Sequence, residues 1–224
     1  MNILVTGGLG AVGSVLVPEL EKRGHNVFVI DLNTHYHAEN YARVDVGEFR
    51  QLEKLWTGKG WDRGYLHSPR KFDMVFHLAA EFGRWNGEDY YETMWKTNAV
   101  GTKNLLKMQE KEGFKTVYFS TSEVYGDFRD VMVEKVMENT EVKQLNDYAL
   151  SKWVNEQQVL NSASMYATES VRVRLFNSYG PGEYYSPYRS VICLFAYRAL
   201  KNIPYIVYKN HSRTSIFITD VVNS

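Results

Sequence analysis

The chain has 224 residues, and its 26 Lys and Arg residues balance 26 Asp and Glu residues, which gives a formal charge of zero. Hydrophobic residues make up 44% and charged residues 23%, proportions that exclude a disordered chain. The balanced charge offers no basic surface for nucleic acid or an anionic membrane, and no apolar run could span a bilayer. The first residues lack the charged region of a signal peptide, and the single Cys193 excludes an internal disulfide. We therefore expect a cytoplasmic protein.

Short β-branched runs alternate with longer amphipathic stretches, the pattern of βαβ units in a parallel sheet. The predicted strands are residues 2–6, 27–31, 43–46, 72–77, 115–119 and 170–175. The predicted helices are residues 12–23, 48–56, 88–112 and 147–166. The first strand is almost entirely apolar, as a central strand buried on both faces should be. The sequence thus predicts an α/β fold with a doubly wound parallel sheet covered on both faces.

Two stretches depart from the alternation. Residues 57–70 are rich in glycine and aromatic residues without periodicity, which predicts a surface loop. Residues 177–188 follow a predicted strand and are rich in turn-forming residues, which predicts a second long loop. Loops that follow the carboxyl ends of strands build the ligand crevice of an open α/β sheet.

A G-x-x-G-x-x-G motif, formed by Gly7, Gly10 and Gly13, joins the first predicted strand to the first predicted helix. Glycines there allow a tight turn and let the backbone approach a pyrophosphate, whose charge the helix N-terminus then stabilises. The last glycine lets the helix pack closely on the strand. Glycine-rich turns are common, but the strand–turn–helix setting favours dinucleotide binding.

Two aspartates at predicted strand ends suit the rest of such a dinucleotide. Asp31 ends the second strand, where a carboxylate accepts hydrogen bonds from an adenosine ribose and repels a 2′-phosphate, which favours NAD over NADP. The alternative for Asp31 is a surface helix cap. Asp45 ends the third predicted strand and could bond the adenine amino group, although a plain turn role fits it almost as well.

A Y-x-x-x-K motif places Tyr148 and Lys152 at the start of a predicted helix, where residues four apart are neighbours on one face. The spacing also occurs at Tyr205 and Lys209, but those residues lie in a predicted strand, where they would stand roughly 13 Å apart. Only the first pair can therefore cooperate.

A free tyrosine has a pKa of about 10, and lowering it to about 7 requires roughly 4 kcal/mol. The Lys152 ammonium and the positive ring of an oxidised nicotinamide are suitable sources of this stabilisation. Tyr148 could then take a proton from a substrate hydroxyl while hydride leaves the same carbon. Without the glycine loop, the pair would be read as an ordinary helix-surface contact.

Polar residues follow the strand predicted over residues 115–119, again at a carboxyl end. Ser120, Thr121 and Ser122 carry hydroxyls that could bond a reacting sugar oxygen, and Glu123 could serve as a second acid or base. The alternative is a hydrogen-bonded turn.

The order of these motifs resembles that of the extended short-chain dehydrogenase/reductases, and more narrowly of the NAD-dependent nucleotide-sugar epimerase/dehydratase family. The resemblance runs the length of the chain and rests on residues 7–13, 77–80, 98 with 101–102, 120–126, 148 with 152, and 177–181. It implies a Rossmann-like fold, NAD as cofactor and a nucleotide sugar as substrate.

The resemblance also implies roles for single residues. Tyr148 is the base, Lys152 holds the nicotinamide ribose and tunes Tyr148, and Thr121 bonds the sugar O4. Asn98 supports the active-site helix or a proton-relay water, and His77 has a structural role near the cofactor. The implied cofactor contacts are Gly7, Gly10, Ala11, Val12, Gly13, Asp31, Leu32, Asp45, Val46, Leu78, Ala79, Ala80, Asn98, Ser120, Tyr148 and Lys152. The implied substrate contacts are Thr121, Ser122, Glu123, Asn177, Arg189 and Arg213, of which Arg213 would bind the diphosphate.

The overall reaction depends on the step after oxidation at C4. Ser122 and Glu123 stand where dTDP-glucose-type 4,6-dehydratases carry Asp and Glu, so the base is present and the strong acid is not. Thr-Ser-Glu resembles GDP-mannose-type 4,6-dehydratases and uronate decarboxylases. We therefore expect a 4,6-dehydratase-type reaction, with a 4-epimerase or UDP-uronate decarboxylase as alternatives. An NAD-binding protein without turnover is the alternative from another class.

Family members normally continue beyond the segment that resembles residues 217–222, so we expect a truncated substrate-binding part. The predicted domains are an NAD-binding domain over residues 1–175 and a partial substrate-binding region over residues 176–224. The helices predicted over residues 88–112 and 147–166 resemble those that pair in family homodimers. No metal is expected, because His35, His37, His67 and His211 show no ligand spacing.

Overall fold

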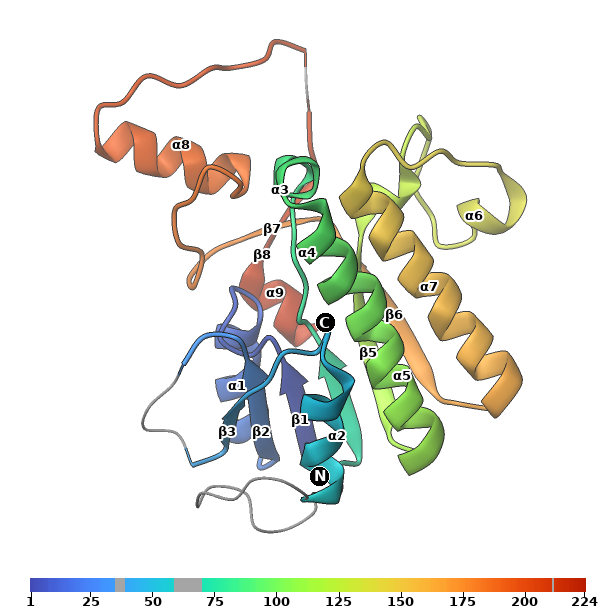
Figure 1. Ribbon diagram of the computed structural model, residues 1–224. Coiled ribbons are helices and arrows are strands. Elements are labelled where there is room, and N and C mark those ends of the chain that lie inside the picture. The colour runs from blue at the N-terminus through green and yellow to red at the C-terminus, as the bar shows by residue number, and fades with distance from the viewer. Residues whose placement is uncertain (35–38, 59–69, 211) are drawn as a thin grey trace.

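A computed structural model describes residues 1–34, 39–58, 70–210 and 212–224 (Figure 1). Its main sheet is parallel and has the order β3-β2-β1-β4-β5-β6. These strands are β1 (Asn2–Thr6), β2 (Asn26–Asp31), β3 (Tyr41–Arg43), β4 (Met74–His77), β5 (Lys115–Thr121) and β6 (Ser170–Leu175). The order reverses at β1, as in a doubly wound fold, so the predicted fold class is confirmed.

Helices lie against both faces of the sheet (Figure 1). On one face, α2 (Phe49–Thr57) and α5 (Gly101–Glu112) pack on side chains such as Leu4 and Val75, and α7 (Asp147–Tyr166) packs on Tyr118. On the other face, α1 (Gly13–Lys22) packs on the intervening residues, including Ile3 and Val5. Alternate residues of β1 thus supply two cores, which explains its continuous apolar sequence.

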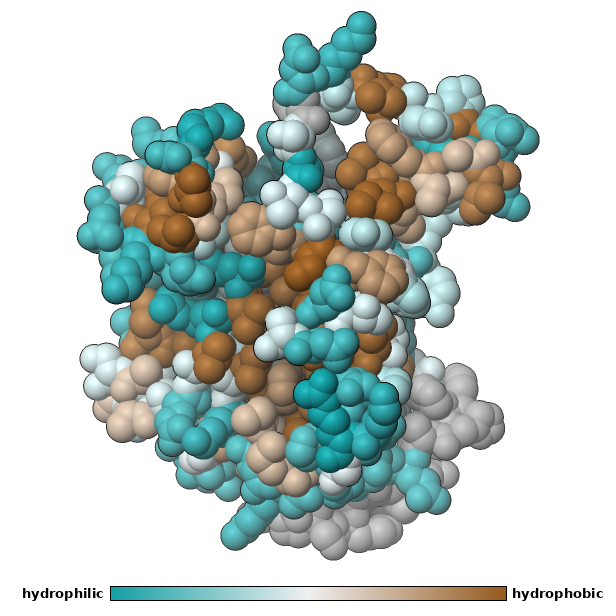
Figure 2. All heavy atoms as spheres, turned by 180° about the vertical axis from the view of Figure 1, so that it is seen from behind, coloured by the Kyte–Doolittle hydropathy of each residue, from teal (hydrophilic) through white to brown (hydrophobic). Residues whose placement is uncertain are grey.

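The back of the sheet is less completely covered than predicted. Val117 and Phe119 of β5, with Val173 and Leu175 of β6, are only half-buried, and Val171 is exposed. Figure 2 views this back side, and hydrophobic side chains gather across its middle. Helical cover on this face comes from α1 and from α9 (Ile218–Asn223), whose Val222 joins the core beneath α1.

The prediction of one continuous helix over residues 88–112 is wrong. The chain instead forms α3 (Arg84–Asp89), α4 (Tyr91–Trp95), a π-helical segment η1 (Lys96–Val100) and then α5. Tyr90 leaves the helical region, with φ −132° and ψ 48°, and so separates α3 from α4. Single π-turns inside α-helices occur mostly at functional sites, and this one contains the buried Asn98.

The strand boundaries and the carboxyl-terminal elements also differ from the prediction. The third strand is β3, so Asp45 and Val46 follow it rather than end it. The loop predicted over residues 177–188 begins with a short strand, β7 (Asn177–Tyr179), which pairs in parallel with β8 (Ser215–Phe217). The strand predicted at residues 205–209 is absent from the described chain, and α8 (Val191–Leu200) was not predicted.

Two short helices complete the described residues: the 3-10 helix η2 (Ser122–Tyr125) and α6 (Val136–Asn139). Most of the loop predicted over residues 57–70, together with His35, His37, His67 and His211, lies outside the described residues. None of the described helices is both long and apolar enough to cross a membrane.

Candidate active site

The glycine motif forms a close-packed turn between β1 and α1. Gly7 has φ +70°, and a Cβ on it would lie 2.7 Å from the backbone nitrogen of Ala79. A Cβ on Gly13 would lie 2.5 Å from the Cα of Gly8, so the helix could not pack this closely with any other residue. Gly10 is exposed, and backbone rather than side chain forms the surface there. Ala11 and Val12 lead into α1, whose N-terminal amides suit a pyrophosphate.

Asp31 presents its carboxylate beside this loop, at the carboxyl end of β2. One oxygen accepts a hydrogen bond from the Leu9 backbone at 3.0 Å, and the other accepts one from the Asn33 backbone at 3.0 Å. The negative charge is therefore fixed next to the turn, and Leu32 is exposed beside it. This arrangement fits the ribose role predicted for Asp31, and it is not a helix cap.

Asp45 has the structure of a turn residue. Its carboxylate accepts a hydrogen bond from the Gly47 backbone at 2.8 Å and lies 3.4 Å from the Lys96 ammonium. Val46 is buried against the core between α2 and α5. These contacts support the turn role of Asp45, while an adenine contact stays a prediction.

His77 lies at the end of β4, just before Leu78, Ala79 and Ala80, which continue along the crevice. It is buried between the hydroxyls of Thr6, at 2.7 Å, and Thr102, at 3.1 Å. Burial, assisted by the nearby Lys152 charge, lowers the pKa of His77 to about 3. A neutral imidazole bridging β1 and α5 has the structural role that the resemblance implies.

Tyr148 and Lys152 lie one turn apart on α7, facing the end of β5. The Tyr148 phenol lies near the Thr121 hydroxyl and the Glu123 carboxylate, and both influence its pKa. The Lys152 ammonium donates to the Phe119 backbone oxygen at 2.7 Å and lies 5.1 Å from the centre of the Tyr118 ring. The structure thus brings together the tyrosine, lysine and threonine that the sequence selected.

The electrostatics at Tyr148 differ from the expectation. Burial and the neighbouring Glu123 carboxylate raise the pKa of Tyr148 above its ordinary value, and the nearby Thr121 hydroxyl only partly opposes them. Burial lowers the pKa of Lys152 to about 7, against the opposing pull of Glu156. Lys152 donates to a backbone carbonyl rather than to the phenol, so the protein's own groups leave Tyr148 a weak acid.

Glu123 is oriented by Asn146, the N-cap residue of α7. The Asn146 side chain donates to Glu123 at 2.9 Å, and its oxygen accepts from the Ala149 backbone at the start of α7. The Thr121 oxygen accepts from the Glu123 backbone at 3.3 Å, which fixes η2. The segment is therefore a hydrogen-bonded turn, and the acid/base role of Glu123 stays a prediction. Ser122 is half-exposed beside them.

Asn98, at the centre of η1, connects α7 to the loop after β4. Its side chain accepts from the Glu81 backbone nitrogen and donates to the Glu81 backbone oxygen, both at 2.9 Å. The same amide donates to Ser151 at 2.9 Å, and Ser151 donates to the Tyr148 backbone oxygen at 2.8 Å. These contacts fit the first of the two roles that the resemblance implies for Asn98, support of the helix that carries Tyr148, while the proton-relay role stays a prediction.

The other residues predicted to bind substrate are not grouped with Tyr148. The Asn177 side chain donates to the Thr214 backbone oxygen at 2.8 Å, so it holds β7 to β8. Arg189 stacks over the Phe82 ring at 4.4 Å, and its Nε is buried without a hydrogen-bond partner in the described chain. Arg213 is exposed in the segment before β8. These side chains therefore have surroundings separate from those of Tyr148.

A buried charge cluster beneath the site escaped the sequence reasoning. Glu156 of α7 contacts Ser120, Arg172 and Arg174. The Ser120 hydroxyl donates to Glu156 at 2.6 Å, and a contact between Ser120 and the cofactor stays a prediction. Two features of the sequence could have predicted this cluster: a carboxylate four residues after Lys152, and two arginines among the apolar residues of the β6 strand.

The fold and these residues define a dinucleotide-binding α/β protein with the Tyr–Lys pair of short-chain dehydrogenase/reductases. Residues 3–224 match the NAD dependent epimerase/dehydratase family. The chain belongs to this family, which confirms the resemblance and, for the family, the expected NAD cofactor.

Curated relatives and solved structures cover nearly the whole chain. A UDP-N-acetyl-alpha-D-glucosaminuronate decarboxylase of Bacillus cytotoxicus is 32% identical over 99% of this chain and 68% of its own length. UDP-glucuronic acid decarboxylase 4 of Arabidopsis thaliana is 30% identical over 99% of this chain but 49% of its own length. The Thermus thermophilus UDP-glucose 4-epimerase complex with NAD gives a TM-score of 0.81 at 26% identity, covering 100% of this chain and 72% of that one.

Proposed function

We propose that the chain binds NAD and oxidises C4 of a UDP-sugar, with Tyr148 as the base. The observation that carries this is the grouping of Tyr148, Thr121 and Glu123 at the carboxyl ends of the strands, where an open α/β sheet binds ligands. Asp31 and the glycine turn fit the cofactor, which when bound accepts the C4 hydride and returns it. The UDP-sugar class comes from the named relatives.

In this mechanism Thr121 and Tyr148 hold the 4-hydroxyl of the sugar, and Tyr148 takes its proton. Because burial and Glu123 raise the pKa of Tyr148, a positive charge beside the phenol has to offset them. Lys152 carries such a charge below a pH of about 7. Asn98 and Ser151 keep this turn of α7 in place.

For the step after oxidation we propose loss of the carboxylate of a UDP-uronate. A ketone at C4 makes the C6 carboxylate that of a β-keto acid, which loses carbon dioxide without a further base. Two of the relatives carry decarboxylase names. The second candidate is the 4,6-dehydration expected from the sequence, and it is favoured by the Glu123 carboxylate beside Tyr148, which could take a C5 proton.

The test is incubation with NAD and UDP-glucuronate, UDP-N-acetylglucosaminuronate, UDP-glucose or UDP-N-acetylglucosamine, with mass spectrometry of the products. Loss of carbon dioxide supports decarboxylation, and loss of water supports dehydration. Tyr148→Phe should reduce turnover at least about 100-fold while NAD still binds. Tyr166→Phe, at the exposed end of α7, is the matched control. Inert sugars, or a fully active Tyr148→Phe, would contradict the proposal.

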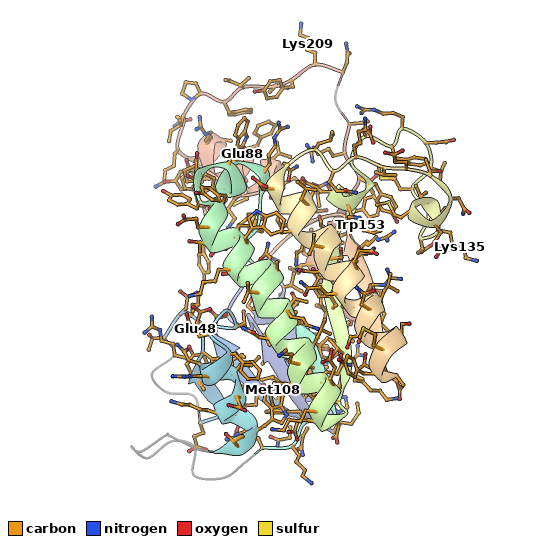
Figure 3. All side chains as sticks on the ribbon, turned by 45° about the vertical axis from the view of Figure 1, so that its right-hand side comes forward. Glu48, Glu88, Met108, Lys135, Trp153 and Lys209 are labelled. Atoms are coloured by element: carbon orange, nitrogen blue, oxygen red, sulfur yellow. The ribbon has the colours of Figure 1, made fainter. Side chains whose placement is uncertain are left out.

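Two further expectations stay proposals. Residues 176–224 supply the sugar side of the crevice, and residues 1–175 supply the cofactor side. A homodimer would form through the outer surfaces of the helices that Figure 3 shows side by side, α4 to α5 and α7. Exposed apolar side chains there agree with this: Tyr91, Val100, Leu150 and Leu160.

A further inference from the structure

Three side chains on one face of α7 lie against the last three residues of β5. Tyr148, Lys152 and Glu156 are four residues apart, so they share a helix face. Tyr148 lies near Thr121, Lys152 donates to the Phe119 oxygen at 2.7 Å, and Glu156 accepts from Ser120 at 2.6 Å. Glu156 therefore shares a helix face with Tyr148 and Lys152, the two residues that act in the proposed mechanism.

Glu156 is completely buried, and its carboxylate is held by two arginines of β6. Arg174 makes a bidentate pair, with Nε 2.9 Å from Oε1 and Nη2 2.7 Å from Oε2. Arg172 adds a bond from Nη1 to Oε2 at 3.2 Å. Burying a charge costs several kcal/mol, and well-packed apolar residues often do as well or better for stability. Fold stability alone is therefore a poor reason for this arrangement.

The same network reaches the segment that carries Glu123. Nη1 of Arg174 donates to the Tyr125 hydroxyl at 3.0 Å and to the Glu134 backbone oxygen at 3.0 Å. Tyr125 is the last residue of η2, two residues after Glu123. Figure 3 labels Trp153 on this side of α7, where it packs with Val124 and Tyr125. One carboxylate thus fixes α7, β6 and η2 relative to the end of β5.

The Lys152 amine is enclosed by groups from three elements. His77 of β4 is neutral, because its pKa is about 3, and Tyr118 of β5 presents its ring. On α7 itself the neighbours are Tyr148 and Glu156, and the pKa of Tyr148 is raised. Among the described residues, Glu156 is the group whose charge raises the pKa of Lys152 against burial.

We propose that Glu156 is a positioning residue for the reaction at Tyr148: it keeps the Lys152 amine charged and fixes the register of α7 against β5. The inference rests on the proposed function for its consequence, because the proposed mechanism needs a positive charge near the Tyr148 phenol and Lys152 lies one helical turn away. The inference concerns the protonation state of Lys152, which can be measured even if the enzyme turns over no substrate.

The test is the Glu156→Gln variant, which keeps the shape of the side chain and an acceptor for Ser120 but removes the charge. Lysines labelled with carbon-13 at Cε are titrated by NMR, and the Lys152 signal is identified by its loss in Lys152→Arg. The wild-type signal should titrate near pH 7 and the variant signal at lower pH. If the midpoint falls by one pH unit, the charged fraction above the midpoint falls about tenfold. The pH above which turnover declines should move the same way.

Unpaired Arg174 could unfold the single variant, so Glu156→Gln with Arg174→Met is made as well, which leaves neither partner of the pair charged. Glu169→Gln is the matched control, because this exposed carboxylate pairs with Lys115 at the far end of β5. A lower Lys152 midpoint in a folded Glu156 variant supports the inference, even if every sugar proves inert. An unchanged midpoint would overturn it, even if turnover falls.

Discussion

Asp31 combines two tasks in one side chain. Its oxygens hold the backbone of Leu9 and Asn33, and its charge is the one that we propose for the adenosine ribose. A 2′-phosphate there would meet a fixed negative charge that is bonded to backbone amides and, within the described part of the chain, has no cation paired with it. Asp45, by contrast, already pairs with Lys96. The two aspartates that the sequence placed at strand ends therefore differ in the charge they can offer a ligand.

The first prediction concerns cofactor choice. The wild-type protein should bind NAD at least about tenfold more tightly than NADP, because repulsion of the phosphate and loss of a charged hydrogen bond both act at Asp31. Asp31→Asn should weaken NAD binding and strengthen NADP binding. Isothermal titration with each dinucleotide measures both constants. Asp45→Asn is the control and should leave the ratio nearly unchanged, and a wild-type preference for NADP would refute the role given to Asp31.

Residues whose role depends on their neighbours in sequence could be predicted from sequence. Gly7 and Gly13 needed only a strand–turn–helix context, and Tyr148 with Lys152 needed only helical spacing. The Glu156–Arg174 pair joins α7 to a strand 18 residues later, and no local pattern reports which carboxylate meets which arginine. The bond from Lys152 to a backbone oxygen of β5 was hidden for the same reason.

At the scale of elements, the errors fall where tertiary contacts outweigh local pattern. Residues 177–179 looked like a turn but pair with residues 215–217, which are too distant in sequence to be recognised as a partner. The helical periodicity of residues 88–112 was real, yet Tyr90 and the π-segment around Asn98 divide it. Asn98 places its amide on Glu81 and Ser151, so the irregular turn coincides with the support of α7.

One irregular element, the strap formed by residues 180–190, runs from the glycine turn to α3. At one end Gly182, with φ +86°, lies against Ser14 and Ala11 beside the glycine turn. At the other end the Tyr188 hydroxyl donates to Asp89 of α3 at 2.8 Å. This hydrogen bond raises the pKa of Tyr188 to about 12, so the hydroxyl remains a donor at neutral pH.

If NAD binds at the glycine turn as proposed, the strap should slow its release, because Gly182 lies against residues Ala11 and Ser14 of that turn. Tyr188→Phe removes the bond to Asp89 but keeps the ring contact with Tyr90. We expect NAD to dissociate about fivefold faster from this variant, measured by stopped-flow displacement. Tyr184→Phe lies in the same strap, 76% exposed, and serves as the control. Equal release rates from both variants and the wild type would show that the bond does not retain the cofactor.

At the scale of the whole molecule, the centre of the sheet contains an ionisable group that the fold keeps neutral. His77 connects β1, through Thr6, to α5, through Thr102, and Ala79 donates to the same Thr6 oxygen at 3.1 Å. Because that oxygen already accepts from Ala79, its proton is available for Nδ1 of His77, and Nε2 then donates to Thr102. A second proton on the ring would disrupt this chain of hydrogen bonds.

His77 should therefore make the fold sensitive to acid. Its pKa is about 3 in the folded protein and about 6.5 in an unfolded chain, so below pH 6.5 only the unfolded chain takes up the proton. The free energy of unfolding should fall by up to about 1.4 kcal/mol for each pH unit between 6.5 and 3, and be fully recovered above 6.5. The pKa of Lys152 is about 7 in the folded protein and about 10.5 in an unfolded chain, so Lys152 changes the free energy of unfolding mainly between these pH values and little between pH 3 and 6.5. Urea unfolding of the wild type and His77→Asn at pH 7.5 and 5.5 isolates the effect, because the carboxylates are common to both. The variant should be less stable at pH 7.5 yet lose less on acidification, and parallel losses in the two proteins would place the acid sensitivity elsewhere than at the centre of the sheet.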